Sequence, residues 1–170
     1  MSKTISPDET MDAIMQAVTL GRDGDTERAR TVLTEIWESI GPQGDPLHRC
    51  TLAHFMADLQ PDAAQALAWD VRALDAAASL TNERAQQHHS TLDVAGFYPS
   101  LHLNLADNYR QLGSFEAAQR EIDSTRACLH TLGDDPYGET IRTVLDEVES
   151  AIHARSTVRR ESAPGTSPAR

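Results

Sequence analysis

The chain has 170 residues, which is long enough for one domain with a buried core and short terminal tails. It contains 23 alanines and only 8 aromatic residues, a composition that favours closely packed helices over a sheet sandwich and predicts an all-α fold. The formal net charge is −11, and an acidic protein repels nucleic-acid phosphates and anionic lipid surfaces, so neither is an expected partner.

The location expected from the sequence is cytoplasmic. No segment approaches the roughly 20 apolar residues that a membrane span requires, and the first 16 residues lack the apolar stretch of a secretory signal. Cys50 and Cys128 lie far apart in the sequence. In a reducing compartment such thiols usually serve as small core residues, so we expect no disulfide.

We expect residues 1–9 to be flexible and a first pair of helices to follow within residues 10–43. The turn between these two helices is predicted at "GDTERA", Gly24 to Ala29. Ala17 and Leu20 precede the glycine at helical spacing, and Leu33 follows it on the second helix.

A second helix pair is predicted within residues 46–80. Its first helix carries Leu52, Ala53 and Met56, and its turn has Gln60 and Pro61 in place of a glycine. The second helix is predicted to bury one apolar stripe, made of Leu67, Val71, Leu74 and Ala78.

Residues 81–98 are predicted to be an insertion. The turns at Gly24 and Gln60 are 36 residues apart, near a repeat period of about 34, whereas Gln60 and Gly113 are 53 apart, a surplus of about 19 over that period. Thr81 is a candidate helix cap for a short stretch, and residues 96–99 read as a loop. We expect an extended second helix followed by a loop.

The third predicted pair spans residues 99–132 and contains "LNLADNYRQLGSFEAA", Leu103 to Ala118. Here Ala106, Tyr109, Gly113 and Ala118 repeat the spacing seen around Gly24. We expect the two alanines to sit where the paired helices approach closely, so that Ala106→Leu separates them.

A last helix is predicted over residues 136–154, with Asp135 as its cap and Ile141, Leu145, Val148 and Ile152 on one face. Residues 155–170 carry a charge of +3, which leaves −14 for the rest of the chain. This segment has few apolar residues and is predicted to be a disordered tail. The alternative is that its arginines fold back on the acidic body.

The recurring pattern resembles the tetratricopeptide repeat (TPR), in which small residues let two helices of a hairpin approach and a glycine permits the turn. The match is close over residues 99–132, fair over 10–40 and weaker between them. The whole chain is similar to small actinobacterial TPR proteins. The resemblance implies an array of about three helical hairpins with a C-terminal capping helix, and it implies no reaction.

The sequence offers no catalytic or metal constellation. His88 and His89 are adjacent and therefore point apart on a helix, and no cysteine pair or HExxH spacing accompanies them or His54 and His102. There is no GxSxG elbow. We therefore expect no enzyme, no cofactor and no metal.

The resemblance implies that one helix face of the second and third pairs lines a concave groove. The candidate partner-binding residues on that face are His54, Asp58, Asn104, Asp107, Arg110 and Gln111. Two acidic residues among them favour a basic or mixed-charge ligand over one that ends in a carboxylate. Arg110 is expected to be exposed, so that Arg110→Ala would shift the melting temperature by no more than about two degrees.

The sequence leaves two functions open. The first is a non-catalytic module or scaffold that binds a protein or peptide in this groove. The alternative is a regulatory sensor that takes a small molecule or signalling peptide at the same place. The oligomeric state is not predicted.

Overall fold

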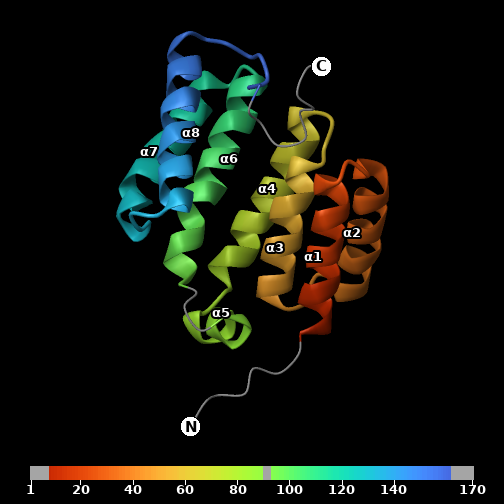
Figure 1. The fold of residues 1–170 in the computed structure, drawn as a ribbon. Helices are drawn as coiled ribbons and strands as arrows, with labels where there is room; N and C mark the ends of the chain where they lie inside the picture. The colour runs from red at the N-terminus through yellow and green to blue at the C-terminus, as the bar shows by residue number, and fades with distance from the viewer. Residues whose placement is uncertain (1–7, 90–92, 162–170) are drawn as a thin grey trace.

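Helices make up nearly all regular structure in the computed structural model, which describes residues 8–89 and 93–161 (Figure 1). No strand occurs in these two ranges, so the predicted all-α class is confirmed for them. The helices are α1 (Glu9–Arg22), α2 (Thr26–Ile40), α3 (Pro46–Asp58), α4 (Ala63–Ala78), α5 (Asn82–His88), η1 (Val94–Phe97), α6 (Tyr98–Gln111), α7 (Phe115–Cys128), η2 (Leu129–Thr131) and α8 (Pro136–His153).

Side-chain caps and glycine turns explain where the helices begin and end. Five α-helices start at an aspartate whose carboxylate accepts a backbone N–H of the first turn, namely Asp8, Asp25, Asp45, Asp62 and Asp135. After α1 and α6 the chain turns through Gly24 and Gly113, whose φ angles of 98° and 77° suit glycine. The turns predicted at these two glycines, and the cap predicted at Asp135, are confirmed.

Consecutive helices pack side by side. Contacts join α1 to α2, α3 to α4 and α6 to α7, while α3 also touches α1 and α2, and α4 touches α6. Figure 1 shows these helices standing next to one another from α2 on one side to α7 and α8 on the other, with α5 across one end. Within the described residues, no helix is long and apolar enough to span a bilayer.

The core around α6 and α7 depends on small residues. Ala106 and Ala118 are completely buried and pack with Leu103 and Ile122. The last helix, α8, covers this cluster with Ile141, Leu145, Val148 and Ile152, the face that the sequence predicted. An apolar helix face that would otherwise be open to water is thereby closed.

The stripe predicted on α4 is wrong. Val71 is 48% exposed and Ala78 is also exposed, whereas Ala73, Ala76 and Ala77 are buried. These alanines pack in a cluster with Cys50 and Ala53 of α3 and with Leu101 of α6. Leu67 and Leu74 of the predicted stripe are half-buried, and Leu74 packs against this cluster. Because α4 lies between two helices, its small side chains face the close contacts and Val71 is left exposed.

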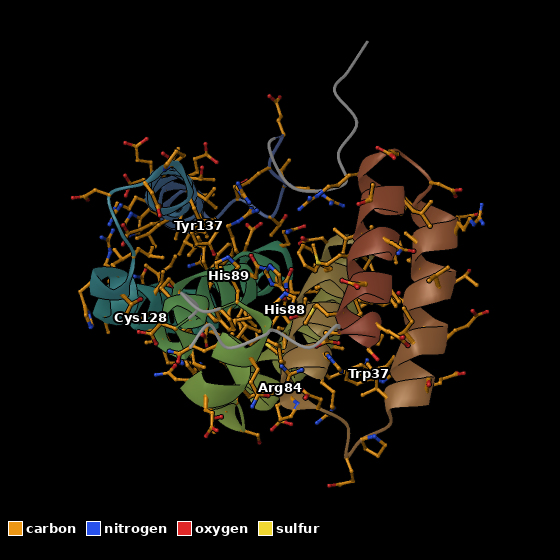
Figure 2. The ribbon with its side chains drawn as sticks, turned by 60° about the horizontal axis from the view of Figure 1, so that its bottom comes forward. Trp37, Arg84, His88, His89, Cys128 and Tyr137 are labelled. Atoms are coloured by element: carbon orange, nitrogen blue, oxygen red, sulfur yellow. The ribbon has the colours of Figure 1, made fainter. Side chains whose placement is uncertain are left out.

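The inserted segment forms the separate helix α5 and the 3-10 helix η1, rather than an extension of α4. The chain leaves α4 at Ser79, and Thr81 caps α5 by accepting the backbone N–H of Arg84. Figure 2, in which this end of the molecule comes forward, shows Arg84 and His88 there. The short helix capped by Thr81 is therefore confirmed, and the extended helix is not.

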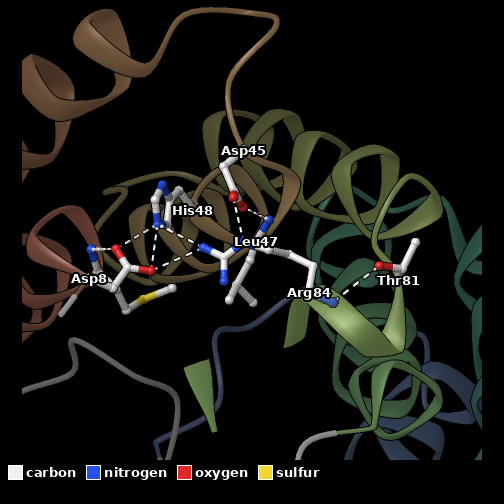
Figure 3. Close-up of polar contacts among 7 residues, drawn as sticks. Asp8, Asp45, Leu47, His48, Thr81 and Arg84 are labelled. Atoms are coloured by element: carbon white, nitrogen blue, oxygen red, sulfur yellow. Dashed lines mark hydrogen bonds and ion pairs between the residues drawn. The ribbon is translucent and has the colours of Figure 1, made fainter. Parts of the chain in front are cut away.

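A polar network ties α5 to the start of α1 and α3 (Figure 3). Arg84 donates through Nε to Asp45 at 2.5 Å and through Nη2 to Asp8 at 3.0 Å, and Nε2 of His48 lies 2.8 Å from Asp8. Burial would raise the pKa of Asp8, but its hydrogen bonds with His48, Met11 and Arg84 outweigh this effect and lower the pKa to about 2. The network therefore holds a charged carboxylate in place at neutral pH.

At both ends of the part of the chain that the structure describes, residues predicted to be flexible have defined positions. Asp8 and Glu9 form the cap and first residue of α1, so the predicted flexibility of residues 1–9 fails for these two, while residues 1–7 lie outside the described part. Residues 155–161 lie against the helices instead of forming a disordered tail. Residues 162–170 lie outside the described part.

The buried position of Ala106 generates a first prediction. Ala106→Leu should lower the melting temperature by several degrees, because an enlarged side chain between packed helices typically costs 1–3 kcal/mol. Thermal unfolding followed by circular dichroism measures the shift. Ala127→Leu, at an exposed position on α7, is the matched control and should shift it little. Identical curves for wild type and Ala106→Leu would contradict the packing described above.

Candidate functional site

A cavity of about 60 Å³ lies among α3, α4, α6 and the segment that follows α8. One water needs about 10–15 Å³ on this scale, so there is room for a small chemical group. The cavity opens to solvent beside the exposed Pro61 and Asp62. Four carboxyl groups line it, those of Asp58, Asp62, Asp70 and Asp107, together with two guanidinium groups, those of Arg159 and Arg160.

Most of the predicted partner-binding residues come together here. Asp58, Asn104, Asp107 and Gln111 line the cavity. His54 does not line the cavity but contacts a residue that does: its Nδ1 is 3.3 Å from the side-chain nitrogen of Asn104. Residues of α3 and α6 that are about 50 positions apart in the sequence thus share one surface.

Arg110 is the exception, because its side chain has 0% exposure. Its Nε and Nη2 donate to Oδ1 of Asp107 at 2.9 and 2.7 Å, and its Nη1 donates to the backbone carbonyls of Ser156 and Val158 at 2.7 and 2.8 Å. The expectation of an exposed groove cation at this position is therefore wrong. A guanidinium removed from water needs such partners for its donors.

The segment after α8 reaches the cavity because the helix ends in a sharp turn. Arg155 has a φ of 51°, and Ser156 donates its backbone N–H to the carbonyl of Ala151, which reverses the chain. In Figure 1 the segment crosses from the end of α8 to the end of α6. Arg160 then pairs with Asp107 at 3.3 Å and with Glu147 at 3.0 Å.

Asp107 connects Arg110 of its own helix with Arg160 of the segment after α8. Its Oδ1 accepts from Arg110, while its Oδ2 accepts from Arg160 and, at 3.4 Å, from Gln111. The carboxylate is nearly buried, and two guanidinium groups compensate its charge. Its role in the structure is therefore to bind cationic side chains.

Asp70 is the least compensated group at the cavity. It is 2% exposed, its Oδ2 accepts from Asn108 at 2.6 Å, and its Oδ1 has no hydrogen-bond partner among the described residues. Burial, and then the charge of Asp58, raise the pKa of Asp70 to about 8, although Asn108 and Asn104 favour its ionised form. Near neutral pH this carboxyl is thus largely protonated.

Asp58 has a milder version of the same environment. Burial raises its pKa, while the nearby His54, Arg159 and Arg22 act in the opposite direction. Asp58 thus lies near two guanidinium groups, whereas the environment of Asp70 favours its protonated form. A positively charged occupant of the cavity would stabilise the ionised form of Asp70.

The histidines that raised the question of metal binding do not gather at one place. His88 ends α5 and His89 follows it (Figure 2), while Nδ1 of His102 pairs with Glu121 at 2.7 Å. Within the residues that the structure describes, no three His, Cys, Asp or Glu side chains are placed to hold a metal ion. Burial raises the pKa of the Cys50 thiol to about 12, so a reactive thiolate is disfavoured there.

Sequence reasoning missed Asp70, Asn108, Arg159 and Arg160 as members of the site. Asp70 was not a member of the apolar stripe predicted on α4, although its spacing from Ala73 and Ala77 was an available signal. The opposite charges of the tail and the body were the signal for the two arginines. Comparisons with known protein families, with curated proteins and with solved structures find no match.

The burial of Arg110 generates a second prediction. Arg110→Ala should lower the free energy of unfolding by about 3 kcal/mol, because it leaves Oδ1 of Asp107 and two backbone carbonyls without their donor. Urea unfolding measures the loss. Arg120→Ala, at an exposed position on α7, should change stability by less than about 0.5 kcal/mol. Equal effects of the two substitutions would show that Arg110 is not held as described.

A third prediction follows from Asp70. The pKa of this carboxyl is about 8 in the folded protein and near 3.8 in an ordinary environment, so the folded state retains a proton that the unfolded state releases between these values. Stability should therefore fall as pH rises from about 4 to 8, by up to about 1 kcal/mol per pH unit.

Asp70→Asn removes this titration and should be increasingly more stable than the wild type as the pH rises through that range. Urea unfolding at several pH values provides the test. Asp62→Asn, at the exposed rim, should keep the wild-type slope. Parallel curves for wild type and Asp70→Asn would contradict the raised pKa.

Proposed function

We propose that this protein is a non-catalytic, TPR-like array of three helical hairpins, and that its groove binds an extended basic peptide segment of a partner protein. The hairpins would be α1 with α2, α3 with α4, and α6 with α7, and α8 would cap the last of them. Tight turns at Gly24 and Gly113 and the buried Ala106 and Ala118 support this reading.

The observation that carries the proposal is the position of residues 156–160. This segment has no helix or strand of its own, and Val158 is 73% exposed, so little apolar burial holds it. Its contacts resemble those of a bound peptide. Arg110 donates hydrogen bonds to two of its backbone carbonyls, and Arg160 pairs with the acidic side chains of Asp107 and Glu147. These contacts support an extended basic segment as the ligand of this surface.

The charge of the body agrees with such a partner. Acidic residues at the cavity would speed the approach of a basic segment and would disfavour an acidic one. A regulatory sensor for a small molecule would use the same surface. The peptide is preferred because the group already seated there is a polypeptide.

The test is a titration of the full chain with a labelled six-residue peptide that copies residues 156–161, followed by fluorescence anisotropy. The chain's own tail competes at an effective concentration in the millimolar range, so binding to the wild type should be weak. Arg160→Gln loosens the tail and should strengthen peptide binding by about threefold or more.

Two controls separate this effect from net charge. Arg120→Gln makes the same change in charge on the exposed face of α7 and should leave peptide binding unchanged. A peptide in which glutamine replaces both arginines should bind much more weakly. If the two peptides bind equally, or if neither binds the Arg160→Gln protein, the groove is not a site for basic segments.

A further inference from the structure

We infer that the cavity between α3, α4 and α6 is a subsite for one guanidinium group of the ligand, with Asp70 as its principal acceptor and Asp58 as its second carboxylate. This inference rests on the proposed function and deepens it. It names the arginine side chain as the group that the cavity selects.

The first argument is the unused acceptor on Asp70. A buried carboxylate oxygen without a hydrogen bond is costly, and native structures rarely keep one. Oδ1 of Asp70 is such an atom, and Asp70 lines a cavity that opens to solvent. A donor that enters the cavity would satisfy it.

The second argument concerns the charges that face Asp70 from each neighbouring element. Asp58 approaches from α3 with His54 nearby, Asp107 lies on α6, and Asp62 lies at the rim. Arg110 and Arg160 already pair with Asp107. Arg159 and Arg22 act on Asp58, whereas burial, Asp58 and two asparagines act on Asp70, so a cation that entered the cavity would stabilise the ionised form of Asp70.

The third argument is the match in shape and donors. A guanidinium is planar and presents several N–H groups, so it can donate to two carboxyls and to side-chain amide oxygens at once. Asn104 and Asn108 place their amides beside the two aspartates. Arg159 at the same cavity shows that a guanidinium is accommodated at its edge.

The experiment uses acetyl-arginine amide as a probe and acetyl-citrulline amide as its uncharged counterpart, both added to the full-length chain. NMR chemical shifts report binding, and the carboxyl carbon signal of Asp70 reports its titration. The arginine probe should shift backbone signals around the cavity and lower the pH midpoint of Asp70, because a bound cation favours the ionised carboxylate. The citrulline probe should do neither.

Asp70→Asn should weaken binding of the arginine probe by at least about fivefold. Asp75→Asn, which makes the same change in charge at an exposed position of α4 outside the cavity, should change it by less than about twofold. Since Asp70→Asn is expected to be at least as stable as the wild type near neutral pH, lost binding cannot be attributed to unfolding.

The outcomes distinguish this inference from the proposed function. Basic peptides could bind the groove while Asp70→Asn changes neither their affinity nor that of the arginine probe. In that case the subsite is wrong and the proposed function stands. If the arginine probe binds through Asp70 but no basic peptide binds, the subsite stands without the peptide groove. Equal binding of the arginine and citrulline probes overturns the subsite.

Discussion

The burial of one guanidinium group organises the end of the molecule that holds the candidate site. Arg110 has no access to water, so each of its donors must find an acceptor within the protein. Asp107 supplies one acceptor from the same helix, but the others are backbone carbonyls of residues 156 and 158. The course of the chain after α8, the position of Arg160 and the shape of the neighbouring cavity all depend on this requirement.

The carboxyl groups in the same region differ in how well nearby cations compensate them. At the cavity, Asp107 is compensated by two arginines, whereas burial and the charge of Asp58 leave Asp70 largely protonated near neutral pH. An uncompensated buried carboxyl lowers stability, and such groups are commonly kept where they contribute to binding. The α5 end shows the contrasting case, because Asp8 there is paired with Arg84 and His48 and its charge is stabilised.

Small residues decide how close these groups can come. Alanines on α4 lie against α3 and α6, and this contact brings Asp70 of α4 to the side chains of Asn104 and Asn108 on α6. Larger side chains there would separate the helices and open the cavity to water. Packing and electrostatics at the site are thus two consequences of one helix contact.

Local features of the fold could be read from the sequence alone. Helix starts at Asp135 and Thr81, the turns at Gly24 and Gly113, and the inner face of α8 all depend on residues within a few positions of one another, and all are as predicted. The face of α3 and α6 that carries Asp58 and Asp107 was expected only from the resemblance to a known repeat, which implied a groove there. The buried face of α4, the burial of Arg110 and the docking of residues 155–161 were decided only by the tertiary structure. Each depends on neighbours that are distant in the sequence: α4 has a helix on both sides, and the donors of Arg110 are satisfied by carbonyls some 46 residues away. Local spacing carries no information about such partners, since they meet only when the helices have packed.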